Sequence, residues 1–402
     1  MSQPARAIPR SRTWLLALVT GCLCCVLAVQ LSTSTQAVTL PLYDFAEYWA
    51  AGRLIAHGQN PYDSDSIARL ERDVGRDGDP LPMLNPPWTL PFVLPFGMLP
   101  GHLAHLLWIS FNFVIVLVAS DLLWHEYGGP RASRGIAWLL AFTFVPTFLT
   151  LYLGQIAAFM LGGVALFLRC ERRGEYVRAG AATLLLAVKP HLFILFWLAF
   201  GWQAFDRRGF RMASGAFLAL MAGTLLAMAF NPAVLEQYRQ MLVDTPPSGY
   251  RTPTIGTVLR LLFGEEHFAW QFVAPLAGVV WFLPVWIRRD RSSGWKEQMP
   301  MLLFVSLLTA PYGSWPFDLI VLLLPVIQIA ATAMKNGASI RGAAIAYAAA
   351  NATAAIFIVA KIDFFWWIWL TPALLLSYLT GLQSLRRIRE MPALSSHRQF
   401  AH

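Results

Sequence analysis

Residues 101–124 read GHLAHLLWISFNFVIVLVASDLLW. This run contains a single carboxylate, Asp121, and is long enough to cross a membrane as one helix, for which about 20 apolar residues suffice. The rest of the chain has the same character: 57% of its 402 residues are hydrophobic, 13% are charged and the mean hydropathy is +0.52. Soluble proteins have roughly a quarter of their residues charged. The composition therefore excludes a cytosolic globular enzyme and a disordered protein, and it predicts an all-α polytopic membrane protein.

The apolar segments predict about twelve transmembrane helices, at 14–33, 101–124, 135–150, 153–169, 178–189, 190–205, 212–230, 268–287, 299–312, 316–334, 341–360 and 364–385. An even number places both termini on one side. If that side is the cytoplasm, the inner segments hold 22 Lys and Arg against 7 Asp and Glu, and the outer segments hold 9 against 14. This excess follows the positive-inside rule. The net charge of +9 therefore reflects topology, and we expect membrane lipids but no nucleic acid as partners.

Three pairs of short spans are predicted to meet at polar or proline-containing tips on the outer side, at 153–155, 189–191 and 311–316. Broken helices are tolerated in a membrane where they line a cavity enclosed by protein or filled with water. The tips therefore predict a cavity open to the extracytoplasmic face. The segment 178–205 could also be one kinked span, but the basic loop at Arg207-Arg208 favours a hairpin.

Two outer segments, 34–100 and 231–267, are too long to be simple connectors. In the first, residues 44–54 have the pattern of a short amphipathic helix, with Asp44, Glu47 and Tyr48 on one face. Residues 85–96 are apolar but interrupted by prolines, which predicts a segment in the membrane interface. We expect one domain over 1–402, ending in a cytoplasmic tail at 386–402.

Charged residues beside a membrane cavity are candidates for function, because burying charge there is costly. Asp44 has two interpretations, a general base that takes a proton from a hydroxyl or an N-terminal helix cap. Lys189 suits an anion such as a lipid phosphate, although a snorkelling lysine is the alternative. Phosphate loops, zinc-binding cysteine pairs and nucleophile elbows do not appear in the sequence, and no metal or cofactor is expected.

The remaining candidates are weaker, since each has a common structural role. Arg251 is a second phosphate candidate, and Asp318 could pair with a cation or cap the next helix. Gln155 could bind a sugar hydroxyl or cap its own helix, and Trp315 could stack on a sugar or lie in the interface. Glu47 is expected to be a solvated or salt-bridging neighbour, and His191 a structural histidine.

The sequence resembles glycosyltransferase family 87 of bacteria. The resemblance rests on Asp44-Phe45-x-x-Tyr48-Trp49-Ala50-Ala51-Gly52-Arg53, Gly58-x-Asn60-Pro61-Tyr62-Asp63, Asn85-Pro86-Pro87, Gly154-Gln155, Lys189-Pro190 and Pro311-x-x-Ser314-Trp315-x-x-Asp318. It implies a GT-C fold and a polyprenol-phosphate-mannose-dependent mannosyltransferase whose catalytic aspartate is Asp44, with Tyr48 and Arg53 in the same motif. Mycobacterial members have a histidine near the late Ser-Trp motif. Asp318 follows that motif here, so the sugar is left open.

The implied reaction needs one base, because a polyprenyl phosphate leaves without an acid. We expect Asp44 to deprotonate the acceptor hydroxyl of a glycan or glycolipid in an inverting single displacement. Lys189 and Arg251 would hold the lipid phosphate, and grooves between spans would hold the isoprenoid tail. The expected location is the bacterial plasma membrane. A carrier or scramblase for polyprenyl-linked sugars, without catalysis, is the alternative.

Overall fold

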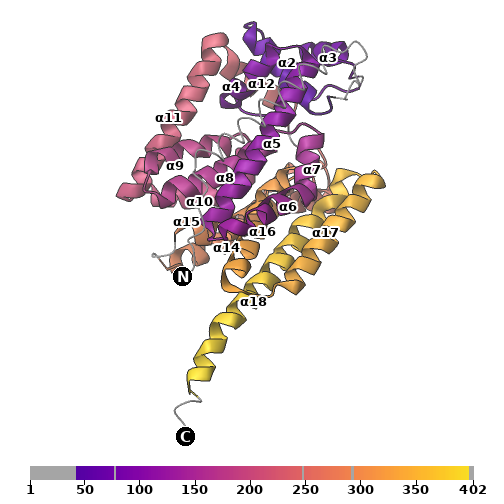
Figure 1. The fold of residues 1–402 in the computed structure, drawn as a ribbon. Helices are drawn as coiled ribbons and strands as arrows, with labels where there is room; N and C mark the ends of the chain where they lie inside the picture. The colour runs from indigo at the N-terminus through magenta and orange to yellow at the C-terminus, as the bar shows by residue number, and fades with distance from the viewer. Residues whose placement is uncertain (1–41, 77, 247–248, 291–293, 398–402) are drawn as a thin grey trace.

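The computed structural model describes residues 42–76, 78–246, 249–290 and 294–397, with side chains up to 387. The predicted span 14–33 lies outside these residues. Within them the protein is helical and contains no β-strand (Figure 1). It is a polytopic membrane protein, because several of its helices are long and apolar enough to cross a bilayer.

Short helices form one end of the molecule, which we call the α2 end (Figure 1). The segment 42–100 contributes α2 (Phe45–Ala56), α3 (Ser64–Asp73), the 3₁₀ turn η1 (Pro87–Thr89) and α4 (Leu90–Gly97). The second long loop adds α12 (Val234–Asp244) and α13 (Ile255–Phe263). The prediction that the first of these loops carries short helices is confirmed, and the helices of the second were not predicted. Helices α2 and α4 touch at glycines, since a Cβ on Gly97 would lie 2.1 Å from the Arg53 nitrogen.

Among the residues that the structure describes, six helical segments are long and apolar enough to span a membrane. They are α5 (Gly101–Glu126), α11 (Arg207–Phe230), η6 (Phe268–Phe272) with α14 (Val273–Arg288), η7 (Asp318–Leu322) with α16 (Leu323–Asn336), α17 (Arg341–Val359), and η8 (Phe364–Trp369) with α18 (Leu370–His397). The pair α6 (Gly135–Thr143) and α7 (Val145–Tyr152), preceded by η2 (Arg131–Ser133), bends by 63° and makes at most a seventh span in the described residues.

The structure does not support the predicted count of twelve spans. The other predicted segments form shorter helices, namely α8 (Ala157–Arg172), α9 (Tyr176–Ala182) with η3 (Thr183–Leu185), η4 (Pro190–Phe193) with α10 (Ile194–Gln203), and α15 (Trp295–Leu308). Most of α8 and α15 is buried against other helices. Hydropathy does not distinguish a helix that faces lipid from one that is buried in protein, and this is why the sequence overestimated the count.

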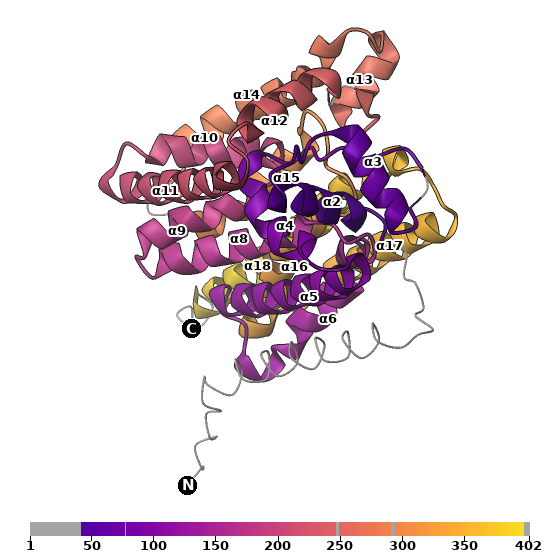
Figure 2. The same ribbon diagram turned by 90° about the horizontal axis from the view of Figure 1, so that it is seen from above.

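The chain between α8 and α11 forms a hairpin, as the basic loops indicated. Tyr176, at the start of α9, lies under the guanidinium of Arg208 at the start of α11. The chain then reaches Lys189 at the α2 end and returns to Gln203, whose carbonyl lies beside Gly209 of α11. Helices α9 and α11 lie side by side (Figure 2) and approach closely because Gly180 and Gly215 have no side chains.

Candidate functional site

The three predicted tips come together at the α2 end, and side chains satisfy the backbone carbonyls that the helix breaks release. Such groups need partners because unsatisfied polar backbone is costly in a membrane. The bonds run from Trp108 to Gly154 (2.7 Å), Asn85 to Val188 (2.8 Å), Trp197 to Pro190 (3.0 Å), Thr150 to Phe317 (3.0 Å) and Gln271 to Pro311. The tips are therefore fixed in place by neighbouring elements.

Asp44 lies immediately before α2, yet its side chain makes no capping bond to the helix. Instead, its Oδ2 accepts a hydrogen bond of 2.8 Å from Nε2 of Gln155, in the tip between α7 and α8. Burial raises the pKa of the Asp44 carboxyl, while the bond from Gln155 and the charge of Lys189 partly oppose that rise. The capping interpretation of Asp44 is therefore wrong, and its second oxygen remains open to another partner.

Gln155 joins the residues of this site. Its Oε1 accepts from the Tyr48 hydroxyl at 2.9 Å and from Nζ of Lys189 at 3.3 Å. With donors on the oxygen side, the amide must present its N–H to Asp44, so its orientation is defined by chemistry. The prediction that Gln155 caps its own helix is wrong, because α8 has no side-chain cap.

Lys189 and Asp318 form a buried ion pair, with Nζ 2.7 Å from Oδ1. The Asp318 side chain is fully buried and that of Lys189 is 12% exposed. The other Asp318 oxygen accepts from the Trp315 backbone N–H at 3.1 Å, and the Lys189 ammonium lies over the Phe317 ring. Lys189 is therefore not a snorkelling lysine. Asp318 pairs with a cation, which was one of the two roles predicted for it.

Glu47 shares the predicted face of α2 with Asp44 and Tyr48. It is 8% exposed and has no hydrogen bond or ion pair within the described residues. Burial, followed by the charge of Asp44, raises its pKa well above the usual value. The expected salt bridge is therefore absent among these residues. A raised pKa favours the protonated form of the carboxyl, and in that form it can donate a hydrogen bond to a hydroxyl.

Three other candidates have contacts with residues other than Asp44 in the described part of the chain. Arg53, at the far end of α2, lies over the Trp49 ring. His191 stacks on Tyr312 with ring centroids 4.4 Å apart. Arg251 is 65% exposed and pairs with Glu265 at 2.6 Å, so it has no bond to Lys189 or Asp44 in the described part of the chain. Arg251 and Trp315 instead line a separate cavity.

Sequence reasoning missed two neighbours of this site. Arg76, which pairs with Glu71 at 2.7 Å, lowers the pKa of both Asp44 and Glu47. No spacing signal connects position 76 with α2, because a loop brings them together. Tyr250 lies within electrostatic reach of Glu47, whose charge raises its pKa.

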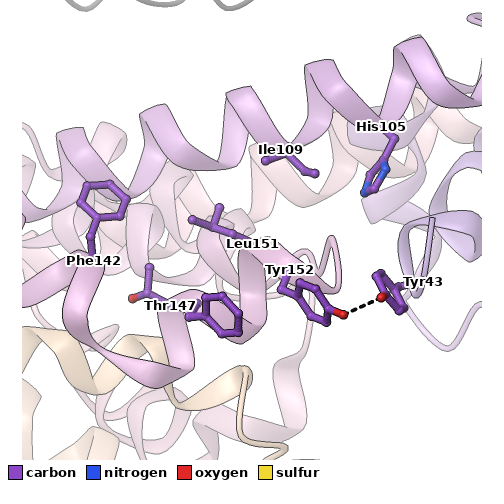
Figure 3. A pocket seen from close by; sticks show the side chains of 8 residues that line it. Tyr43, His105, Ile109, Phe142, Thr147, Leu151 and Tyr152 are labelled. Atoms are coloured by element: carbon purple, nitrogen blue, oxygen red, sulfur yellow. Dashed lines mark hydrogen bonds between the residues drawn. The ribbon is translucent and has the colours of Figure 1, made fainter. Parts of the chain in front are cut away.

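A mainly apolar cavity of about 530 Å³ begins beside Asp44, between α5, α6 and α7. At its mouth the hydroxyls of Tyr43 and Tyr152 are hydrogen-bonded at 2.5 Å (Figure 3). Nε2 of His105 and Oγ1 of Thr147 are buried in its wall without partners in the described residues. Tyr43, which directly precedes Asp44 in the chain, is therefore part of the cavity wall.

Gly154 allows the first tip to approach α2. Its φ is +69°, and a Cβ would lie 2.6 Å from Cβ of Phe45, the residue after Asp44. We expect Gly154→Ala to destabilise the protein by about 1–3 kcal/mol more than Gly174→Ala, from overpacking alone. Gly174 is the matched control, because its φ is +71° and nothing lies within 4 Å of the added atom. Thermal unfolding of both variants in detergent tests this, and equal melting temperatures would contradict it.

The model of glycosyltransferase family 87 matches residues 84–311, which is more than half of the chain. The chain belongs to glycosyltransferase family 87. This family 87 protein is therefore a membrane glycosyltransferase. The match includes Gln155 and Lys189, whereas Asp44 and Asp318 lie outside it. No curated protein and no solved structure matched the chain.

Proposed function

We propose that this family 87 protein transfers a sugar from a polyprenyl-phosphate donor to the hydroxyl of a glycan or glycolipid. The reaction would occur on the extracytoplasmic face of the bacterial plasma membrane, within a GT-C fold with both termini cytoplasmic. The supporting observation is the buried chain of bonds from Asp44 through Gln155 and Lys189 to Asp318. It joins the carboxylate of Asp44, in the first long loop, to the cation of Lys189, in the second tip, through Gln155 of the first tip.

Asp44 is the proposed general base. Gln155 occupies one of its oxygens, so the other can accept the proton of an acceptor hydroxyl. Burial raises the pKa of Asp44, which makes its carboxylate a stronger base than an exposed aspartate. In its protonated form, which burial favours, the Glu47 carboxyl would donate a hydrogen bond to a sugar hydroxyl from the same face of α2.

Lys189 is the proposed phosphate contact. Two of its three N–H groups bond Asp318 and Gln155, which leaves one for a donor phosphate oxygen. That contact would strengthen as the phosphate gains charge on leaving. The cavity beside Tyr43 supports a path for the isoprenoid chain, because its wall is mostly apolar. Arg251 has no part in this step, since it pairs with Glu265 elsewhere.

A donor screen tests the proposal. The full chain is reconstituted in liposomes with radiolabelled polyprenyl-phosphate mannose, glucose, galactose or arabinose and a panel of octyl glycosides. We expect one donor to label an acceptor with inversion at the anomeric carbon. Because a polyprenyl phosphate can leave without the help of a metal ion, we expect the rate to stay unchanged when EDTA removes divalent metal ions. Movement of donor across the bilayer without transfer would instead establish the carrier or scramblase function.

The pH dependence tests the base. Asp44 must be charged to accept a proton, so activity is lost as pH falls through its pKa, and burial places that loss above the usual aspartate value of about 3.9. Gln155→Leu removes a hydrogen bond that lowers this pKa. We therefore expect the acid limb of kcat/KM to move to higher pH in this variant.

The matched control is Gln240→Leu, because Gln240 also donates to an aspartate, Asp244, at 2.9 Å but on an exposed surface. Its pH profile should match that of the unmodified protein. An acid limb that stays in place in Gln155→Leu, or moves to lower pH, would show that the titrating group is not Asp44.

A further inference from the structure

A second cavity, of about 610 Å³, is lined in part by Trp315, whose backbone N–H bonds Asp318 of the Lys189–Asp318 pair. Three segments far apart in sequence form its wall: the second long loop, the third tip, and the connection from α17 to α18. Its lining residues are Arg251, Leu261, Trp315, Asp363, Phe364, Phe365 and Trp366. We call it the aromatic cavity. Its volume falls in the range of about 300–1,000 Å³ that is typical of small-molecule sites.

The aromatic cavity combines aromatic rings with polar side chains. Trp366 is 62% exposed, although it is large and apolar. The Arg251 side chain is 65% exposed and keeps N–H groups free beyond its bond to Glu265. One Asp363 oxygen accepts from the Phe365 N–H, and the other remains available. Rings for the apolar face of a sugar therefore stand beside donors and acceptors for its hydroxyls.

The charge of the aromatic cavity argues against an anionic ligand. Arg251 is already neutralised by Glu265 at 2.6 Å, and Asp363 adds a carboxylate. The charged residues of the cavity therefore have no net positive charge, and a lipid phosphate would gain little electrostatic attraction there. A neutral polyhydroxyl ligand fits this balance.

The cavity and the reactive cluster share one structural element, the third tip. Trp315 lines the cavity, and the backbone N–H of the same residue holds Asp318, the partner of Lys189. Tyr250, next to Arg251 in the chain, is within electrostatic reach of Glu47. The third tip and the segment at Tyr250 and Arg251 therefore contribute to the aromatic cavity and also border the reactive cluster.

We propose that the aromatic cavity is a binding subsite for the acceptor. It holds the neutral sugar units that lie one or two positions along the chain from the sugar whose hydroxyl is glycosylated. This inference rests on the proposed glycosyltransferase function. It makes the acceptor an oligosaccharide chain, because a single sugar at Asp44 would leave the aromatic cavity empty.

The test compares acceptors of different length with a variant of the cavity. With mono-, di- and trisaccharide octyl glycosides, kcat/KM should rise about 10-fold from the shortest to the longest acceptor, which corresponds to about 1.4 kcal/mol. Trp366→Ala should remove most of this gain by raising KM for the trisaccharide. Its kcat/KM for the monosaccharide should stay unchanged. Trp202→Ala, which removes a tryptophan 48% exposed outside this cavity, is the matched control.

Three outcomes overturn the inference while transfer persists: no gain with acceptor length, equal loss for short and long acceptors in Trp366→Ala, or loss that depends on anionic phosphatidylglycerol in the liposomes. If no donor supports transfer, the proposed function fails instead. Saturation-transfer NMR with the trisaccharides then still tests the subsite, since binding should be lost in Trp366→Ala and retained in Trp202→Ala. Absence of binding to the unmodified protein would overturn the inference.

Discussion

Asp44→Asn should lower the rate of sugar transfer by about 10²–10⁴-fold, the usual contribution of a general base. The asparagine is nearly isosteric, and its carbonyl oxygen can still accept the hydrogen bond from Gln155. It cannot take a proton from an acceptor hydroxyl. The loss should therefore appear in kcat, while binding of the polyprenyl-phosphate donor changes little. Single-turnover transfer and donor binding, measured in the same liposomes, separate these two effects.

The matched control is Asp73→Asn, because Asp73 is an exposed aspartate at the end of α3 in the same loop region. That variant should transfer sugar at the rate of the unmodified protein. An Asp44→Asn protein that folds normally, binds donor and keeps full activity would show that another group is the base. Glu47, which shares the face of α2, would then be the next residue to test.

Lys189→Met should destabilise the protein by about 3–5 kcal/mol, because it leaves the fully buried Asp318 without its cation. The double variant Lys189→Met with Asp318→Asn removes both charges and should recover most of that stability. Unfolding in detergent measures both. The control Arg239→Gln breaks an exposed pair with Glu236 and should leave the stability almost unchanged.

The double variant also separates structure from function at Lys189. If Lys189 contacts the donor phosphate, KM for the donor stays raised in the double variant even though the fold is restored. Full recovery of KM would assign Lys189 a positioning role only, through its bond to Gln155. A Lys189→Met protein as stable as the unmodified one would contradict the buried-pair argument itself.

The sequence located most of the site because local signals were available. The spacing of Asp44, Glu47 and Tyr48 predicted one helix face, and prolines and glycines marked the three tips. The number of spans was overestimated, since α8, α9, α10 and α15 are apolar but shorter than a bilayer requires. Arg76 could not be found, because no local pattern links it to α2.

By itself, the sequence determined that this is a helical membrane protein and which breaks in the helices carry polar groups. These properties follow from hydropathy and backbone chemistry, which are local. Only the tertiary structure decided which groups meet: that Gln155 bridges Asp44 and Lys189, that Asp318 takes the lysine, and that Arg251 lies elsewhere with Glu265. Each pairing joins residues far apart in the chain, so it depends on how the helices pack.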